Sequence, residues 1–122
     1  MIIADTSIWI NYLKGSNDVK QVFEQLLQRR KVLALSAVFG ELLQGARNNR
    51  EKKIITGFWI NLPKMNEDDL FIQAGNISRE NKLYAKGIGL IDSYILAAAI
   101  QEDISIWTLD KKLEKVINNI AI

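Results

Sequence analysis

The 122-residue sequence contains no histidine and no cysteine. Histidine is the most frequent general acid or base in enzymes, thiolate chemistry needs cysteine, and zinc sites favour both. Any catalysis by this chain must therefore use carboxylates and hydroxyls, and a bound metal is expected to be a hard cation such as Mg²⁺ or Mn²⁺. The absence of cysteine also excludes a disulfide framework and suits the reducing cytoplasm.

Long apolar runs are missing as well. The stretch from Tyr94 to Ile100 is much shorter than the roughly 20 residues that a membrane helix needs, and no basic leader follows Met1. We therefore expect a soluble cytoplasmic protein without a secretory signal or a membrane partner. A chain of this length with 48% hydrophobic residues fits one compact domain over residues 1–122.

Positive and negative charges almost balance. Sixteen Lys and Arg residues against fourteen Asp and Glu give a net charge of +2. If several acids gather at one site, the remaining surface is basic, with its densest run at Arg47, Arg50, Lys52 and Lys53. Such a run is typical of a solvated helix face or of a contact with RNA phosphates, and the sequence leaves both interpretations open.

Short β-type runs alternate with helix-type segments, a pattern typical of a parallel sheet covered by helices. We expect strands at residues 2–4, 32–36, 62–65 and 105–108, and a last strand at 117–122. We expect helices at about 17–30, 37–46, 51–59, 67–86 and 92–101, with a helical segment at 8–13. Ser36 is expected to be a helix N-cap, and Gly87 a helix stop.

Aspartates follow the first and last of these strands. Asp5 comes directly after residues 2–4, and Asp110 closes the run Ile106-Trp107-Thr108-Leu109-Asp110. Ligands of open parallel sheets bind beyond the carboxyl ends of the strands. The sequence therefore predicts that both carboxylates lie at one edge of the sheet.

Each acid of interest also has a structural interpretation. Asp5 precedes a helical segment and is typical of an N-cap, and Asp110 of a turn, an N-cap or an ion-pair partner. Glu41 falls outside the apolar stripe of its helix and faces either solvent or a cleft. Asp92 begins an almost wholly apolar helix, where a carboxylate costs several kcal/mol unless a cap, a cation or a metal compensates it.

Together these four acids have a physical consequence. At about 5 Å and an effective dielectric near 20, each pair of carboxylates repels by roughly 3 kcal/mol. Converging carboxylates therefore need a divalent cation or protonation. A bound Mg²⁺ would orient a phosphodiester and lower the pKa of a water molecule. The set predicts a metal-dependent phosphodiesterase that works without histidine.

Four motifs resemble those of a known family in order and spacing. They are Asp5-Thr6-Ser7, Glu41-Leu42-Leu43-Gln44-Gly45, Leu90-Ile91-Asp92-Ser93-Tyr94-Ile95-Leu96-Ala97 and Thr108-Leu109-Asp110. Over essentially its whole length the chain resembles PIN domains, and most closely the VapC-type toxin ribonucleases of type II toxin-antitoxin systems. The resemblance implies an α/β fold of three layers, with a central, mainly parallel β-sheet flanked by helices. It further implies a homodimeric Mg²⁺- or Mn²⁺-dependent endoribonuclease that a cognate antitoxin holds inactive.

The resemblance also implies roles for individual residues. Asp5 and Asp92 would be the principal metal ligands, Glu41 and Asp110 would complete the acidic set, and Ser7 and Thr108 would be hydroxyls that support the ligands. Many family members carry a further acid two positions after the last of these, where this chain has Lys112. We therefore expect one metal ion.

Three other functions are compatible with parts of the pattern. A receiver-like signalling domain also gathers aspartates at a sheet edge, but Asp5 has no acidic neighbour here. A PIN-like module that binds RNA or a partner without cleaving it is an alternative that retention of all four acids disfavours. A structure-specific DNA nuclease usually carries additional helices that this short chain lacks.

Overall fold

A computed structural model describes residues 1–120 of the chain. Two short strands and seven α-helices are formed there, with one 3₁₀ turn. In order they are β1 (Ile2–Ala4), α1 (Thr6–Leu13), α2 (Asn17–Gln28), α3 (Ser36–Gln44), α4 (Asn49–Asn61), α5 (Leu70–Glu80), η1 (Tyr84–Lys86), α6 (Leu90–Glu102), β2 (Ser105–Trp107) and α7 (Lys111–Ile120).

The strands are parallel, as expected, but the regular sheet is small. β1 pairs with β2 in a register that places Ile3 opposite Ile106. Two further segments extend this layer by single parallel bridges, one from Val32 to Ile2 and one from Ala34 to Lys64. The expected strands at 32–36 and 62–65 thus lie alongside the sheet without forming regular ladders.

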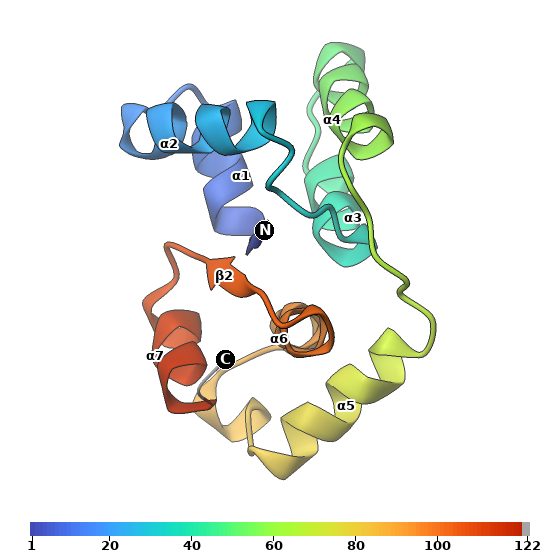
Figure 1. Cartoon of the computed structure of the whole chain (residues 1–122), viewed down its shortest axis with the longest axis vertical. Helices are drawn as coiled ribbons and strands as arrows, with labels where there is room; N and C mark the ends of the chain where they lie inside the picture. The colour runs from blue at the N-terminus through green and yellow to red at the C-terminus, as the bar shows by residue number, and fades with distance from the viewer. Residues whose placement is uncertain (121–122) are drawn as a thin grey trace.

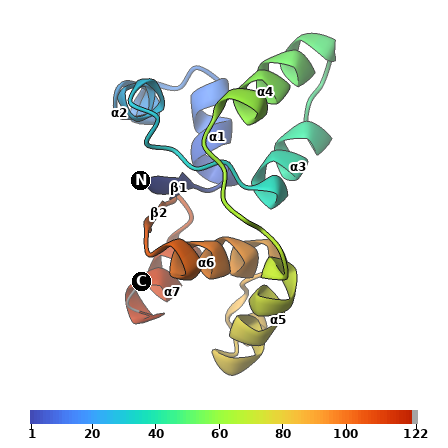
Figure 2. The same cartoon turned by 45° about the vertical axis from the view of Figure 1, so that its right-hand side comes forward.

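Helices cover both sides of this thin layer. Figure 2 shows α1, α2, α3 and α4 on one side of the strand pair, and α5, α6 and α7 on the other. Figure 1 shows the same division from a second direction, with β2 between the two helical groups. The chain is therefore an α/β protein rich in helix, with its parallel strands enclosed on both faces.

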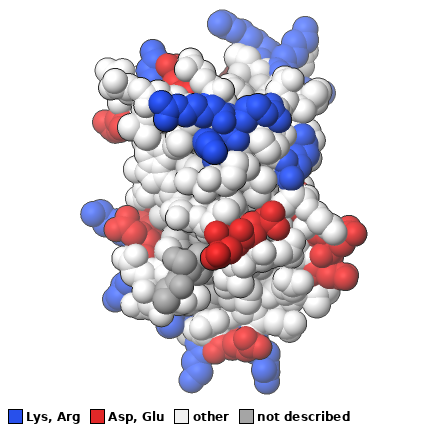
Figure 3. Space-filling view, in the orientation of Figure 1, with Lys and Arg blue, Asp and Glu red and all other residues white. Residues whose placement is uncertain are grey.

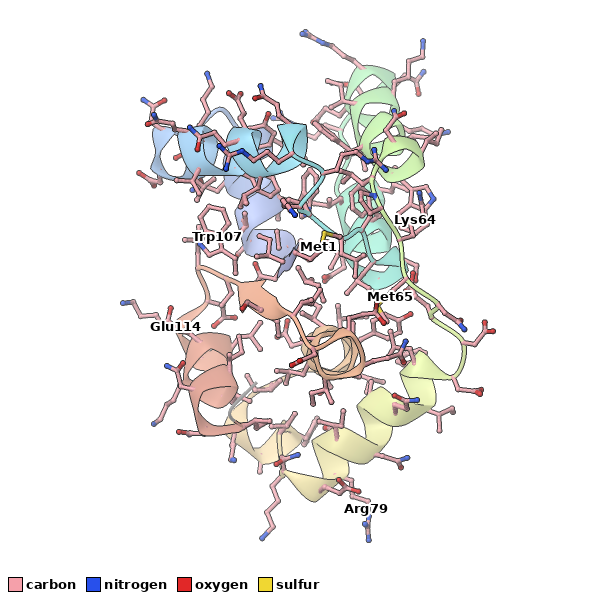
Figure 4. All side chains as sticks on the ribbon, in the orientation of Figure 1. Met1, Lys64, Met65, Arg79, Trp107 and Glu114 are labelled. Carbon is pink, nitrogen blue, oxygen red and sulfur yellow. The ribbon has the colours of Figure 1, made fainter. Side chains whose placement is uncertain are left out.

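The core above the strands is aromatic. Trp9 is 1% exposed and packs edge-on against Phe23, Phe39 and Phe58, at ring-centroid distances of 4.8, 5.1 and 5.2 Å. Trp107 points from β2 toward α2 (Figure 4), where its ring lies 5.9 Å from that of Phe23. This packing fixes α1, and with it the residues at its N-terminus, against the end of β1.

The last expected strand is wrong. Residues 117–120 belong to α7, and residues 121–122 lie outside the described part of the chain. Leu113, Val116, Ile117 and Ile120 recur at the spacing of one helix face and pack into a second small core with α6. The helical period therefore outweighs the β-branched composition of this segment.

The expected helix over residues 67–86 is broken at both ends. Asp69 has a positive φ of 60° directly before α5, and Lys82 has a φ of 53° after it, so neither continues a right-handed helix. Gly87, with a φ of 79°, ends the 3₁₀ turn η1, in agreement with its predicted role as a stop. Ser36 is not an N-cap: Leu35 holds that position without a side-chain bond, and Ser36 is the first residue of α3.

Basic side chains form one continuous row on the face in Figure 3. This row of Lys and Arg crosses the region of α2 and the segment after it, where Arg29, Arg30 and Lys31 are all exposed. Acidic side chains gather lower on the same face. None of the helices within residues 1–120 has the length and apolar character required to span a bilayer.

Candidate active site

Asp5 lies where β1 ends and α1 begins. It is 4% exposed, and its Oδ1 accepts hydrogen bonds from the Ile8 amide at 3.2 Å and from the Ser7 hydroxyl at 2.5 Å. Its Oδ2 accepts a hydrogen bond from the Thr108 hydroxyl. Asp5 is thus the N-cap of α1, and its second oxygen is turned toward the end of the neighbouring strand.

Hydroxyl groups join the carboxyl ends of the two strands. The Ser7 hydroxyl accepts from the Leu109 amide at 2.9 Å, and the Thr108 hydroxyl accepts from the Asp110 amide at 2.9 Å. Each hydroxyl therefore donates to Asp5 while it accepts from the backbone after β2. This double engagement fixes the orientation of both hydroxyls.

Asp110 begins α7. Its Oδ1 accepts from the amides of Lys112 at 2.8 Å and Leu113 at 3.3 Å, which is the geometry of an N-cap. Of the interpretations left open by the sequence, the cap is formed. The residue is exposed at the same edge of the sheet as Asp5, as predicted from its place after the last strand.

Glu41 projects from α3 and is exposed. Its Oε1 accepts a hydrogen bond from the Thr6 hydroxyl at 2.7 Å, a contact between residues 35 positions apart. Thr6 is the one hydroxyl of Asp5-Thr6-Ser7 to which the sequence assigned no separate role. The one indication in the sequence that Thr6 belongs to the site was its position between Asp5 and Ser7, two residues of the predicted site.

Asp92 lies in the first turn of α6 and is partly buried. The pKa of its carboxyl is raised from 3.8 to about 6, first because burial removes water from the charge and then because the carboxylates of Asp110, Asp5 and Glu41 repel it. The N-cap of α6 is Gly89, so Asp92 is not a cap. The other three acids selected from the sequence thus each lie within electrostatic reach of Asp92.

The acids do not form a compact ligand cage. Within residues 1–120, no group of three acidic side chains stands close enough to hold a metal ion. Three of the four carboxylates accept hydrogen bonds from other groups of the protein. Asp5 accepts from two hydroxyls, Glu41 from the Thr6 hydroxyl, and Asp110 from amides at the start of α7. Mutual repulsion favours such separate anchoring. The oxygen donors and the raised pKa of Asp92 fit a hard divalent cation, which would offset that repulsion.

A separate groove opens between the end of α1, the end of α3 and the start of α4. Its volume is about 780 Å³. Apolar side chains and basic side chains both line it, including Ile10, Leu13, Ile54, Lys14, Arg47 and Arg50. Arg47 also forms an ion pair with Glu51 at 2.8 Å, so part of the basic run predicted as a helix face or an RNA contact is neutralised locally.

The sequence has recognisable relatives. A family model for the PIN domain matches residues 2–118. The chain is also similar to Ribonuclease VapC32 of Mycobacterium tuberculosis, from strain CDC 1551 / Oshkosh and from strain ATCC 25618 / H37Rv. Each is 28% identical over 118 residues, an alignment covering 93% of this chain and 88% of the relative. The match over nearly the full length shows that the chain belongs to the PIN domain family.

Proposed function

We propose that the protein is a metal-dependent endoribonuclease that hydrolyses phosphodiester bonds of RNA. The observation that carries this proposal is the placement of Asp5 between the Ser7 and Thr108 hydroxyls at the joined ends of β1 and β2, in a chain without histidine or cysteine. Asp92 lies close enough for the charges of Asp5, Asp110 and Glu41 to contribute to its raised pKa. Membership of the PIN family and the similarity to a protein named as a ribonuclease support the same reaction. They also favour a nuclease over the receiver-like alternative.

Asp5 and Asp92 are the proposed principal ligands of one Mg²⁺ or Mn²⁺ ion, with Glu41 and Asp110 completing the acidic set. Both of the latter are exposed, and the described hydrogen bonds use only Oε1 of Glu41 and Oδ1 of Asp110, so we expect the other oxygen of each to face the ion. A bound divalent cation lowers the pKa of a coordinated water and offsets charge on the attacked phosphate. The residues themselves supply orientation, because Ser7 and Thr108 hold the Asp5 carboxylate from two sides.

The cleavage assay is the direct test of this function. We expect labelled RNA to be cut by the purified protein in Mg²⁺, and cutting to stop in EDTA. Asp5→Asn and Asp92→Asn should each reduce the rate at least about 100-fold, since each removes a charged ligand. Asp18→Asn, at an exposed acid in the first turn of α2, is the matched control and should retain the rate. Equal cleavage by all three variants would remove the support for this mechanism.

A cognate antitoxin is the proposed protein partner. The groove beside α1, α3 and α4 supports such a contact, because its lining includes the exposed apolar side chains of Ile10 and Ile54 and the basic side chains of Lys14 and Arg50. An amphipathic acidic segment is the complementary ligand. Co-purification with the product of a neighbouring gene, lost in Ile10→Asp, tests this partner.

A homodimer is the proposed assembly, and the cytoplasm its proposed location. The apolar side chains of Phe71 and Ile72 on α5 are 53% and 68% exposed, which supports a contact between copies. Light scattering of the wild type and of Ile72→Asp tests the assembly.

A non-cleaving PIN-like module remains the second candidate. The separate anchoring of Asp5, Glu41 and Asp110 favours it, because no three of the described carboxylates are poised for an ion. RNA binding without Mg²⁺-dependent cleavage would select this candidate.

A further inference from the structure

Glu67 lies beyond the carboxyl end of the segment at Lys64, at the same edge of the sheet as Asp5 and Asp110. The parallel layer runs from β2 through β1 and the segment at Val32 and Ala34 to Lys64. Asp5 follows β1 directly, and Glu67 comes three residues after Lys64. Asp5 and Glu67 therefore both lie just beyond the carboxyl ends of segments of this layer. Glu67 is the member of this edge to which neither the sequence patterns nor the proposed mechanism assigns a role.

One carboxylate group joins two helices here. Glu67 accepts from the Ser36 amide at 3.1 Å through Oε2 and from the Ser36 hydroxyl at 2.7 Å through Oε1. The Tyr94 hydroxyl donates to the same Oε1 at 2.5 Å. Ser36 is the first residue of α3, and Tyr94 lies near the beginning of α6. Glu67 itself belongs to neither helix.

The start of α3 needs an external hydrogen-bond acceptor. Its N-cap is Leu35, which provides no side-chain hydrogen bond. The first amides of a helix are otherwise unsatisfied and carry the positive end of its dipole. The Glu67 carboxylate meets the first amide of α3 and compensates its charge. Tyr94 as a whole is 7% exposed, and the bond from its hydroxyl to Glu67 is partly buried.

Helices α3 and α6, which Glu67 connects, carry two of the proposed site acids. Glu41 follows Ser36 by five residues on α3, a rise of about 7.5 Å, and Asp92 precedes Tyr94 by two residues on α6, a rise of about 3 Å. A short rigid path thus leads from Glu67 to each acid.

We propose that Glu67, through Ser36 and Tyr94, is a positioning residue that fixes the spacing between Glu41 on α3 and Asp92 on α6. This inference rests on the proposed metal-dependent nuclease. Without the hydrogen bonds to Glu67, the beginnings of α3 and α6 can move apart. Glu41 and Asp92 then bind one metal ion with lower affinity. Ligand-orienting hydrogen bonds of this kind typically change metal affinity by about 10- to 100-fold.

The test is equilibrium binding of Mn²⁺ to the whole protein, measured from the electron paramagnetic resonance signal of the free ion. Tyr94→Phe removes one hydroxyl and keeps the ring, which packs 5.8 Å from Phe71. Glu67→Gln keeps the shape and removes the charge. We expect each to raise the dissociation constant for Mn²⁺ about 10-fold, while the KM for RNA at saturating Mg²⁺ changes less than about twofold.

A second tyrosine-glutamate pair provides matched controls. The Tyr12 hydroxyl donates to Glu24 at 3.3 Å between α1 and α2, and neither residue contacts α3 or α6 through this bond. Tyr12→Phe and Glu24→Gln should bind Mn²⁺ within about twofold of the wild type. An equal loss in these controls would show general loosening of the fold and overturn the positioning role.

The outcomes separate the two proposals. If the wild type binds Mn²⁺, Asp5→Asn does not, and Glu67→Gln and Tyr94→Phe bind as the wild type does, the positioning role is overturned while the nuclease proposal stands. If the wild type itself fails to bind millimolar Mn²⁺, the metal-dependent mechanism falls, and the role of Glu67 falls with it.

Discussion

The Thr108 hydroxyl donates a hydrogen bond to Oδ2 of Asp5 across 103 positions of sequence. The bond spans the carboxyl ends of β1 and β2, where Ala4 is paired with Trp107. The parallel register places the two residues side by side, and burial of both leaves Asp5 little access to water. The charge of Asp5 is therefore held by protein hydroxyls and by the start of α1.

Thr108→Val tests how far this bond orients Asp5. The substitution keeps the shape and removes both the donor to Asp5 and the acceptor for the Asp110 amide. We expect the affinity for Mn²⁺ to fall about 10-fold and the free energy of unfolding to fall by about 1 to 2 kcal/mol. Calorimetric titration and urea denaturation measure the two effects. Thr56→Val on α4, which carries neither bond, should leave both values near those of the wild type.

Thr6→Val releases the side chain of Glu41. Glu41 is exposed, so loss of the 2.7 Å bond should change stability by less than about 0.5 kcal/mol. The cleavage rate should fall several-fold, and less than in Glu41→Gln, because the carboxylate remains but loses its orientation. A rate in Thr6→Val below that of Glu41→Gln would contradict this order.

The raised pKa of Asp92 predicts a specific dependence of stability on pH in EDTA. Between about pH 4 and 6 the folded state binds more protons at Asp92 than the unfolded state, so this contribution to stability is lost as pH rises through about 6. Asp92→Asn removes the contribution. At pH 7.5 the free energy of unfolding of the variant should be higher than that of the wild type by roughly 1 to 2 kcal/mol. The full pKa shift corresponds to about 3 kcal/mol, and the partial exposure of Asp92 to solvent reduces this effect.

Urea denaturation of both proteins at pH 4.5 and 7.5 measures this difference. The advantage of the variant should shrink at the lower pH, where Asp92 of the wild type is protonated. The affinity for Mg²⁺ in the wild type should in turn increase as pH rises through 6, because the ion competes with that proton. An advantage of Asp92→Asn that is the same at both pH values would contradict the raised pKa.

Trp9→Ala should be the most destabilising of these changes. The ring is 1% exposed and contacts three other aromatic rings, so its removal leaves a cavity and costs about 3 to 5 kcal/mol. Trp59 is only partly buried, with the Lys64 ammonium 4.9 Å from its ring, and Trp59→Ala should cost less. Urea denaturation of the two variants compares them, and a larger loss in Trp59→Ala would place the centre of the core elsewhere.

The local sequence pattern was sufficient to predict those parts of the fold that depend on a single segment of the chain. The β-type runs before Asp5 and Asp110 predicted both regular strands, and the alternation of β-type and helix-type segments predicted that the sheet is parallel. The helical segments around Glu41 and Asp92 were also predicted. The strand at 117–122 was wrong because β-branched residues were weighed above the spacing from Leu113 to Ile120.

Contacts between distant segments could not be read from the sequence. Nothing near Thr6 indicates that its hydroxyl meets Glu41, and nothing near Glu67 indicates that its carboxylate meets Ser36 and Tyr94. The positive φ of Asp69 separates Glu67 from α5, so residues 67–69 resemble a first helical turn in sequence without forming one. Such contacts depend on how the helices pack, which is set by the whole core.

Anomalous diffraction from crystals grown with Mn²⁺ tests the central claim most directly. The claim is that Asp5, Glu41, Asp92 and Asp110 act together around one divalent ion. We expect a single strong anomalous peak within about 2.0 to 2.3 Å of carboxylate oxygens of Asp5 and Asp92, absent in crystals of Asp92→Asn. A peak bound elsewhere, or no peak at these residues at millimolar Mn²⁺, would contradict the account.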